Sequence, residues 1–470
     1  MALGGLEDKF EGLIADSMMR EHIAGLSLAV VKDGKVAYAR GFGARDLKAG
    51  LPATPDTLYG IGSITKSFTA MAIMQLQEAG KLNVDDPVSK HLPEFKLGRE
   101  GKPIAIRHLL SHSSGIPDLG WSDVRINRQV DGEEKWTPLT GFDDFMTFVN
   151  GAKDEVVADP GTRFFYLNEG YVLLGRIVEK ASGMRYEDYV TKKILRPLKM
   201  KRSGFPTKDF EKDGDVATMY QVQKKDNTFA GIPYFPSGFT YSFSPAYAGG
   251  ALFSTVVELC NYLTACMNKG VFEGARVLTE SSMGELFKPR IDPGYPTIFG
   301  KRTYGYGWGV FEDFFGHKCI GHTGSILVSG GDLRFVPDLN LGVAVLFNNA
   351  ASASAYLVAS VVMLLFMGLD PLKLIPNFEM EKRLNLLTGE YQTYKGIAKV
   401  SVVRKGGILF MESKEKLGET SLALVPESDK FETLNFHILT GGTRMPAEFV
   451  IDSSGKVDLF IERNRFRKVK

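Results

Sequence analysis

The pattern of strand signals divides this chain into a large first part and a small second part. In the first part, strand-like runs occur near the start and again around residues 318–347, with helical stretches between and after them. Beyond residue 383, short alternating runs lie between turn signals at Gly406-Gly407, Gly441-Gly442 and Ser454-Gly455. Regularly spaced short strands predict a small β-barrel or sandwich. We therefore expect a domain over 1–370, a linker over 371–384 that holds two prolines and a charge cluster, and a β domain over 385–470.

The first part has the signals of an α+β domain. Apolar runs at 26–31 and 36–39 are joined through Asp33-Gly34, a strong hairpin signal. Helical stretches are predicted from Ser63 to Gly80 and from Glu169 to Ser182. Because strands occur at both ends of the domain, the pattern predicts an antiparallel sheet closed by the N- and C-terminal segments, with helices around it. The predicted late strands are 318–320, 329–336 and 342–347, and a helix is expected from about Ser352.

Composition limits the partners of the chain. Its 470 residues are 44% apolar and 24% charged, which is typical of a soluble globular protein, and the net charge of +2 gives no reason to expect a nucleic-acid partner. The basic segment 463–470 is interpreted as a last strand with alternating charges. Three cysteines without a Cys-x-x-Cys spacing predict neither a disulfide framework nor a zinc site, and favour a reducing, cytoplasmic location.

Two segments are relevant to whether the chain is exported or crosses a membrane. The N-terminus has no basic region followed by an apolar stretch, so no signal peptide is predicted. Residues 350–369 carry no charge and are long enough to cross a bilayer, but they are rich in serine and alanine and lack anchors at both ends. We expect a helix buried against the sheet, and no membrane partner.

Ser63 and Lys66 are the first candidate catalytic residues. Residues i and i+3 share one face of a helix, so the Lys66 amine can reach the Ser63 hydroxyl and take its proton. The same spacing recurs at Ser413/Lys416 and at Ser453/Lys456, in strand-like sequence. The run 60–67 also nearly fits a phosphate-binding loop, but Thr65 stands where that motif requires glycine, so nucleotide binding is not expected.

Two further motifs follow in order. Tyr166-Leu167-Asn168 stands just before a predicted helix: the phenol could relay a proton beside Ser63, and the Asn168 amide could orient both substrate and Lys66. His322-Thr323-Gly324 follows a predicted strand, and its glycine would let substrate approach the strand edge. Taken alone, each motif is better explained structurally, the first as a buried Tyr with an Asn helix cap and the second as a core histidine. The aromatic-rich loop 232–250 is open between substrate binding and packing.

Together, the three motifs in this order resemble the serine β-lactamase and penicillin-binding superfamily. The phrases Leu58-Tyr59-Gly60-Ile61-Gly62-Ser63 and His108-Leu109-Leu110-Ser111-His112-Ser113-Ser114-Gly115 are also similar. The resemblance covers about residues 5–368 and is closest to the class C-like branch, which includes D-aminopeptidases, D,D-peptidases and esterases. The tail beginning Leu387-Thr388-Gly389-Glu390-Tyr391 looks like the lipocalin-like domain of an archaeal serine peptidase in this branch that assembles into an octamer.

The resemblance implies a β-lactamase-like fold with an all-helical subdomain, no cofactor or metal, and a serine hydrolase of amide or ester bonds. Ser63 would form an acyl-enzyme, and Lys66 and Tyr166 would share the general-base and proton-relay roles. It also implies backbone N–H groups of Ser63 and Ser325 as the oxyanion site. Substrate-orienting roles fall on Asn168, His322, Thr323 and Gly324. The resemblance further implies a small peptide or ester as substrate and a homo-oligomer as the assembly, with an octamer as the form taken by the archaeal relative.

The identity of residue 322 bears on the substrate. Many penicillin-recognising relatives have Lys there, whereas a histidine near its usual pKa of about 6.5 is largely neutral at pH 7 and clamps a carboxylate weakly. Peptides with D-residues are therefore favoured over penicillins, with a carboxylesterase or weak β-lactamase as alternatives. A triad built on His112, a scaffold with a retained fold, and ligand carriage by the C-terminal barrel are the remaining alternatives. The retention of Ser63, Lys66, Tyr166 and His322 favours an enzyme over a scaffold.

Overall fold

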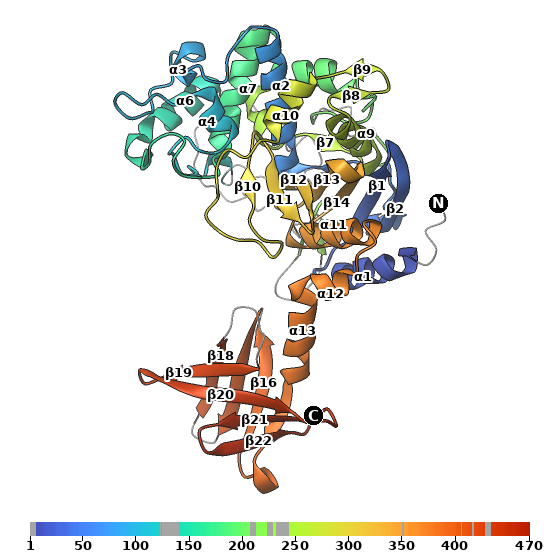
Figure 1. Cartoon of the computed structure of the whole chain (residues 1–470), viewed down its shortest axis with the longest axis vertical. Coiled ribbons are helices and arrows are strands. Elements are labelled where there is room, and N and C mark those ends of the chain that lie inside the picture. Colours follow the sequence, from blue (N-terminus) through green and yellow to red (C-terminus); the bar gives the residue numbers. More distant parts are fainter. Residues whose placement is uncertain are drawn as a thin grey trace. The chain divides into compact units, whose positions relative to one another are not determined.

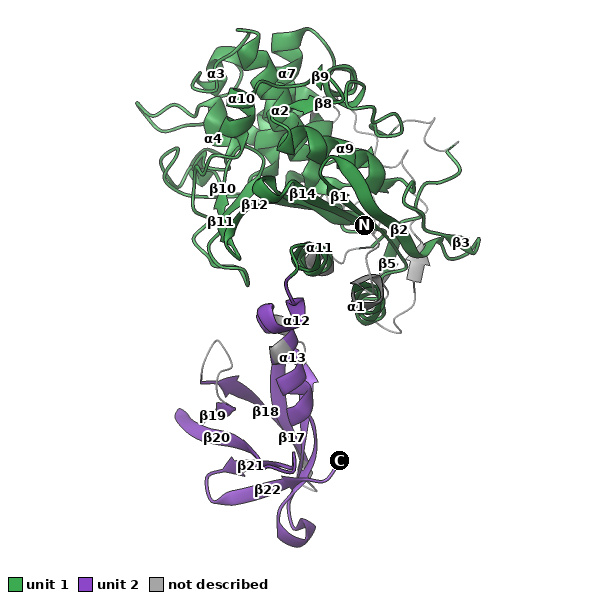
Figure 2. Ribbon diagram, turned by 45° about the vertical axis from the view of Figure 1, so that its right-hand side comes forward, with its two compact units in different colours: residues 1–368 green, residues 369–470 purple. Residues whose placement is uncertain are grey.

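The computed structural model describes residues 6–122, 124, 141–206, 213–222, 229–231, 244–349, 352–405, 407–415, 418–427 and 434–470. These residues form two compact units, 1–368 and 369–470 (Figure 2). The first unit is built on an antiparallel sheet and the second is a closed β-barrel. The predicted α+β class and the C-terminal barrel are both confirmed.

The sheet of the first unit has eight strands in the order β10-β11-β12-β13-β14-β1-β2-β3, so the two ends of the unit meet at its centre (Figure 1). There β1 pairs with β14, from Leu26 opposite Phe347 to Lys32 opposite Leu341. The strands are β10 Thr303–Tyr304, β11 Gly309–Phe314, β12 His317–Ser325, β13 Gly330–Val336, β14 Leu341–Phe347, β1 Gly25–Lys32, β2 Lys35–Asp46 and β3 Leu51–Pro52. Asp33 and Gly34 both have positive φ, as the predicted two-residue hairpin turn requires.

Helices cover both faces of this sheet. Figure 2 shows α1 (Leu6–Arg20) and α11 (Ser352–Phe366) on one face and α9 (Val256–Met267) on the other. The charge-free segment therefore packs against β13 and β14, as predicted. No helix among the described residues is long and apolar enough to cross a membrane.

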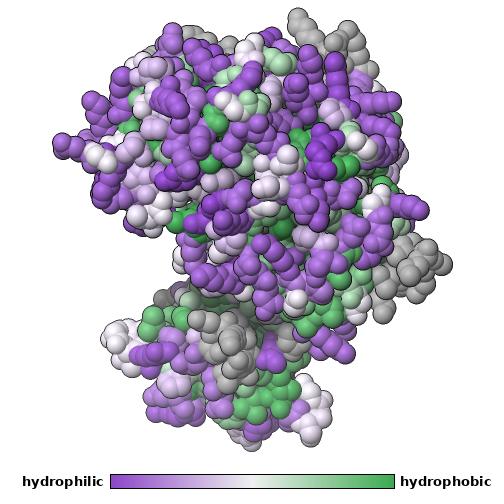
Figure 3. Space-filling view, turned by 45° about the horizontal axis from the view of Figure 1, so that its top comes forward, coloured by the Kyte–Doolittle hydropathy of each residue, from purple (hydrophilic) through white to green (hydrophobic). Residues whose placement is uncertain are grey.

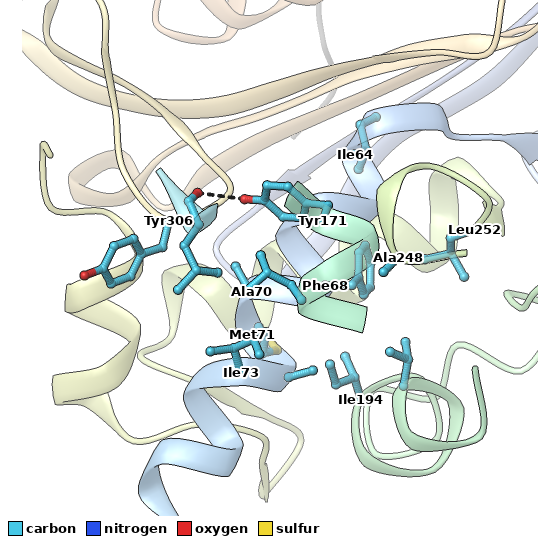
Figure 4. Packing of buried hydrophobic residues seen from close by; sticks show 14 of the residues in the cluster. Ile64, Phe68, Ala70, Met71, Ile73, Tyr171, Ile194, Ala248, Leu252 and Tyr306 are labelled. Atoms are coloured by element: carbon cyan, nitrogen blue, oxygen red, sulfur yellow. Dashed lines mark hydrogen bonds between the residues drawn. The ribbon is translucent and has the colours of Figure 1, made fainter. Parts of the chain in front are cut away.

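A helical subdomain lies beside the sheet (Figure 1). Its centre is α2, Thr65–Glu78, whose residues are mostly buried (Figure 4). The other helices around it are α3 Val88–His91, α4 Ile106–Leu110, α6 Phe142–Gly151, α7 Asn168–Ser182, α8 Tyr186–Val190 and α10 Glu280–Leu286. In Figure 4, the Tyr171 hydroxyl donates a hydrogen bond of 2.8 Å to the Leu110 carbonyl, which joins α7 to α4.

Shorter elements complete the first unit. Among the residues that the structure describes, three two-stranded ribbons pair β4 with β7, β5 with β6 and β8 with β9, and five short helical turns connect larger elements. Their bounds are β4 Tyr59–Gly60, β7 Phe253–Ser254, β5 Tyr220–Val222, β6 Phe229–Gly231, β8 Val271–Phe272, β9 Ala275–Arg276, η1 Gly62–Ile64, η2 Lys153–Glu155, η3 Thr191–Leu195, η6 Ser244–Gly249 and η7 Pro337–Leu339.

The second unit is an eight-stranded antiparallel barrel, closed by pairing of β15 with β22. Its strands are β15 Gly389–Gln392, β16 Lys399–Lys405, β17 Ile408–Glu415, β18 Gly418–Pro426, β19 Asn435–Thr440, β20 Thr443–Ile451, β21 Val457–Ile461 and β22 Asn464–Lys468, with the turn η8 Tyr394–Gly396. The segment interpreted as a linker forms two helices, α12 Pro371–Leu374 and α13 Pro376–Leu387. Leu384 and Leu387 of α13 belong to the barrel core, since their side chains are buried among the strands.

Candidate active site

Ser63 lies in the short turn η1 that precedes α2, and not in the first turn of the helix as the sequence predicted. This turn is pressed against the end of β12. A Cβ on Gly62, whose φ is +53°, would lie 2.4 Å from the Ser325 amide nitrogen, and one on Gly324 would lie 1.9 Å from the Ile61 carbonyl oxygen. Glycine at both positions therefore allows the backbone carrying the hydroxyl to meet the strand edge.

Lys66 is fully buried and directed at Ser63. Its Nζ donates to Ser63 Oγ at 3.0 Å, to Asn168 Oδ1 at 2.8 Å and to the Gly249 carbonyl at 2.6 Å. These three bonds match the three donors of an ammonium group, and all three acceptors are neutral oxygens. The predicted Ser-Lys pair and the predicted contact of Asn168 with Lys66 are thus present in the structure.

Tyr166 closes the other side of the nucleophile. Its hydroxyl is within hydrogen-bonding reach of Ser63, and burial raises the pKa of the Tyr166 phenol above its usual value. The hydroxyl is therefore protonated in the resting site. The Lys66 Nζ lies 5.0 Å from the centre of the same ring, so the phenol, amine and serine hydroxyl form one cluster.

His112 supports this cluster. Its ring stacks on Tyr166 with centroids 4.0 Å apart, and its Nδ1 accepts a hydrogen bond of 2.9 Å from the Leu167 amide. Burial, followed by the Lys66 charge, lowers the pKa of His112 well below its usual value. A neutral imidazole holding the Tyr166-Leu167 backbone fits a structural role better than the triad alternative.

His322 is buried and has both ring nitrogens occupied by protein partners. Nδ1 lies 2.5 Å from the Thr323 carbonyl, which can only accept, so we assign the ring proton to Nδ1. Nε2 lies 2.8 Å from the Tyr304 hydroxyl and therefore accepts a hydrogen bond from it. Burial, followed by the charges of Arg302 and Lys66, lowers the pKa of His322 to about 3. The imidazole is therefore neutral at pH 7.

The motif His322-Thr323-Gly324 lies within β12, because this strand runs to Ser325 and does not end at residue 320 as predicted. Thr323 pairs with Asp332 and Gly324 with Gly331 of β13. The strand thus brings the half-buried Thr323 and Ser325 to the cavity that Ser63 also lines.

Two cavities flank Ser63. One cavity has a volume of about 290 Å³, and its lining includes Tyr295, Arg302, Tyr304, His322 and Thr323. The other, of about 90 Å³, is lined by Trp121, Asn168, Val172, Ala246 and Ile326. Ser63, Tyr166 and Ser325 line both. A substrate held at the Ser63 hydroxyl would therefore place one group in each cavity.

Four residues at or beside this site belong to none of the motifs recognised in the sequence. Arg302 and Tyr304 reach it because the β10-β11-β12 meander folds them back beside His322. Asp118 and Glu169 adjoin Asn168 from a loop and from α7. Only the position of Glu169, next to Asn168, could have suggested one of them from the sequence.

Three other features discussed from the sequence are the aromatic-rich loop, metal ligands and the cysteines. The aromatic-rich loop lies outside the described residues over 232–243, whereas Tyr247 is buried and packs near Phe205. Across the described ranges, no group of three His, Cys, Asp or Glu side chains could hold a metal ion. Cys260, Cys266 and Cys319 are buried and free.

Comparison with known proteins gives two family matches. Residues 10–365 match the Beta-lactamase family, and residues 371–467 match the Pab87 octamerisation domain. The octameric penicillin-binding protein homologue from Pyrococcus abyssi is 38% identical in sequence, with a TM-score of 0.89 over the whole of both chains.

More distant relatives match in part. Protein flp of Staphylococcus aureus is 34% identical over 220 residues, which are 46% of this chain and 42% of that protein, so the match spans less than half of its length. A D-stereospecific amidohydrolase from Streptomyces is 24% identical, with a TM-score of 0.59 over 77% of this chain and 98% of that one. This last likeness is one of fold alone.

Proposed function

Because the chain belongs to the β-lactamase family, we propose that it is a serine hydrolase that acts through an acyl-Ser63 intermediate on amide or ester bonds, with peptides containing D-residues as the favoured substrates. The observation that carries the proposal is the hydrogen bond of 3.0 Å between the buried Lys66 amine and the Ser63 hydroxyl. A serine hydroxyl needs such a neighbour to become a nucleophile.

The first step is attack of Ser63 Oγ on the acyl carbon. In the form of the site that has released one proton to solvent, Lys66 Nζ is a neutral amine. It takes the Ser63 hydroxyl proton either directly or through the Tyr166 hydroxyl, which accepts that proton while passing on its own. The negative charge on the acyl oxygen is stabilised by the backbone N–H groups of Ser63 and Ser325. Loss of one such donor typically lowers kcat by a factor on the order of 10²–10³.

The second step completes the cycle. Collapse of the tetrahedral intermediate expels the amine or alcohol, which takes a proton from the relay, and leaves Ser63 acylated. Water, activated by the same groups, then attacks the ester and restores the serine hydroxyl. Asn168, which accepts a hydrogen bond from Lys66, keeps the amine in place through both steps.

The presence of Arg302 indicates that the larger cavity can bind a substrate group with a carboxylate. No acidic side chain lines this cavity among the described residues, and His322 there is neutral, so Arg302 is its charged group. A guanidinium binds a carboxylate through paired hydrogen bonds. From the sequence, a neutral His322 was expected to disfavour substrates with a carboxylate near the scissile bond. We now propose that Arg302 supplies the positive charge for them.

The barrel supports a homo-oligomer as the working form, because the matched domain is named for octamerisation and the Pyrococcus abyssi homologue is octameric. The barrel also exposes large apolar side chains, among them Ile397, Leu439, Val450 and Phe460. Figure 3 shows hydrophobic surface on this unit. An octamer is therefore our proposal for the assembly.

The decisive test of function is a side-by-side assay of p-nitrophenyl acetate, nitrocefin, and a peptide amide with a D-residue and its L-counterpart. The proposal expects the highest kcat/KM for the D-residue peptide and no turnover of any substrate by Ser63→Ala. Ser453→Ala is the matched control, because Ser453/Lys456 has the same spacing on an exposed turn of the barrel. Turnover of the ester alone would favour the carboxylesterase alternative, and turnover by Ser63→Ala would refute the mechanism.

A further inference from the structure

Glu169 is a buried carboxyl group beside the catalytic cluster that the mechanism above does not use. It follows Asn168 at the start of α7, and its side chain is 1% exposed. Its Oε1 accepts a hydrogen bond of 3.0 Å from the Trp121 amide, and its Oε2 accepts one of 3.4 Å from the Leu119 amide. Glu169 therefore holds the backbone of the loop that also carries Asp118.

Asp118 joins Glu169 to the active site. Its Oδ1 accepts from the Asn168 backbone amide at 3.2 Å and from the Asn168 side-chain Nδ2 at 3.4 Å. The Asp118 carboxylate also lies within hydrogen-bonding reach of the Glu169 carboxyl. Four groups thus form a chain from Ser63 outwards: Lys66, Asn168, Asp118 and Glu169.

The Asn168 amide has two orientations of nearly equal shape, and its neighbours decide between them. In the observed one, its oxygen faces the Lys66 ammonium and its NH₂ group faces the Asp118 carboxylate. Turning the amide over would set NH₂ against the ammonium and oxygen against the carboxylate, and both contacts would be repulsive. The negative charge of Asp118 therefore fixes the orientation that presents an acceptor to Lys66.

The proximity of the two carboxyl groups and the burial of Glu169 favour a state in which the pair holds one proton. Burial, followed by the charge of Asp118, raises the pKa of Glu169 to about 7. Below that pH, the protonated Glu169 can donate to Asp118 and the pair carries one negative charge. Above it, two carboxylates repel each other across the same short distance.

Resting on the proposed function, we propose that Asp118 and Glu169 are positioning residues for Lys66: the Asp118 carboxylate orients the Asn168 amide, and the protonated Glu169 holds Asp118 and its loop in place. Neither residue touches the reacting atoms, and both act through Asn168. The chain sets where the Lys66 amine sits relative to the Ser63 hydroxyl, and so the rate of acylation.

The other charged groups near this chain come from the elements packed around α7. Several of them are engaged with one another, as Arg176 is with Glu179 on α7 and Arg107 is with Asp85. Burial lowers the pKa of His108 on α4 to about 4, so it is neutral at pH 7. The titratable and charged groups on these elements include Asp118 in the loop, Lys66 and Glu78 on α2, Arg107 and His108 on α4, and Tyr171, Arg176, Glu179 and Lys180 on α7.

The test measures the rate at which a fluorophosphonate probe labels the full-length protein between about pH 6 and about pH 8, on either side of the Glu169 pKa. The Ser63 oxygen attacks phosphorus and fluoride leaves, so this phosphonylation depends on the same activation of the hydroxyl as acylation and stands in for it in these measurements. Asp118→Asn should slow acylation on the order of 10-fold to 100-fold at every pH, the effect of losing a hydrogen bond to a charged group. An asparagine at 118 can donate or accept, so it no longer selects one orientation of Asn168. The matched control is Glu179→Gln, the same change as Glu169→Gln ten residues later on the same helix, and it should leave the rate unchanged.

Glu169→Gln separates positioning from a merely structural role. Glutamine keeps the shape and can still donate to Asp118, but it does not titrate. The ratio of the wild-type rate to the Glu169→Gln rate should therefore fall as the pH rises through about 7, because only the wild type gains the second carboxylate. A ratio that does not change with pH overturns the proposal. This comparison does not use Asp118→Asn, so it remains decisive if that variant fails to fold.

The outcomes distinguish this inference from the proposed function. If the wild type is acylated, Ser63→Ala is not, and Asp118→Asn is acylated at the wild-type rate, the positioning role fails and the serine mechanism stands. If the wild type is not acylated, or Ser63→Ala is acylated equally, the proposed function itself fails.

Discussion

At the scale of single residues, the charge of the larger cavity depends on His322, which belongs to a sequence motif, and on Arg302, which belongs to none. His322 stands in a recognisable motif, but burial, followed by the charges of Arg302 and Lys66, keeps its imidazole neutral. Arg302 stands in no motif and contributes the charge. The sequence alone could not reveal this, because Arg302 reaches the cavity only through the register of a meander that places β10 near β12.

Arg302→Gln should lower kcat/KM for peptides with a free carboxylate next to the scissile bond by about 10-fold to 100-fold, since a hydrogen bond to a charged group typically contributes about 1.5–3 kcal/mol. Steady-state kinetics on such a peptide and on p-nitrophenyl acetate provide the measurement, and the neutral ester should be nearly unaffected. Arg290→Gln is the control, because Arg290 is paired with Glu285. Equal losses for both substrates would mean that Arg302 does not recognise the anion.

His322 should also make the first unit sensitive to acid. Its pKa is about 6.5 in the unfolded chain and about 3 in the folded one. Between these values the unfolded state binds a proton that the folded state does not, so the contribution of His322 is complete above pH 6.5 and is lost as the pH falls. From about pH 6.5 to about pH 4.5, this amounts to at most about 2.7 kcal/mol.

The measurement is urea unfolding followed by tryptophan fluorescence, because all three tryptophans lie in residues 1–368. The wild type should lose more free energy of unfolding than His322→Gln when the pH falls from about 7.5 to about 4.5. If both lose the same amount, His322 is not held neutral by the fold.

At the scale of elements, the sequence predicted those whose signal is local. The hairpin of β1 and β2 has Asp33-Gly34 at its turn, and α7 ends at Gly183 with φ of +74°. Contacts between distant segments were not predictable. β12 continues to Ser325 because it pairs with β13 as far as Ser325 opposite Gly330. Leu384 and Leu387 place α13 in the second unit, because their side chains fill the barrel core.

The contact of η1 with β12 is the element-scale feature most sensitive to substitution. Gly324→Ala should reduce acylation by 100-fold or more, as a rough expectation, because its Cβ would lie 1.9 Å from the Ile61 carbonyl and would push η1 away. Labelling by a fluorophosphonate probe measures the effect. Gly284→Ala, in helix α10 with open space around it, should be neutral or slightly stabilising. Wild-type labelling of Gly324→Ala would show that the close approach is not needed.

At the scale of the whole molecule, the chain joins a hydrolase-like unit to a barrel that resembles an octamerisation domain. The class of both units followed from the spacing of strands and helices in the sequence. The family motifs then suggested the site, and Ser63, Lys66, Tyr166 and Asn168 do lie together. For assembly, the sequence offered only the resemblance of the tail that begins at Leu387, because the exposed apolar side chains of the barrel become apparent only from the fold.

Light scattering coupled to gel filtration should give the full-length protein a mass near eight times 51.8 kDa. Val450 and Phe460 lie exposed on the neighbouring strands β20 and β21, so we expect Val450→Glu combined with Phe460→Glu to lower this mass. Burying unpaired carboxylates in an interface is strongly unfavourable. Thr443→Glu, an exposed polar position of the same barrel, is the control. A monomeric wild type would contradict the proposed assembly.

The most direct test of the central claim is to locate the covalent adduct. The protein is treated with a fluorophosphonate probe, digested, and analysed by mass spectrometry. We expect one adduct, on the peptide that contains Ser63, which is lost in Ser63→Ala and retained in His112→Ala and Ser453→Ala. An adduct on any other residue, or one that persists in Ser63→Ala, would contradict the assignment of Ser63 as the nucleophile.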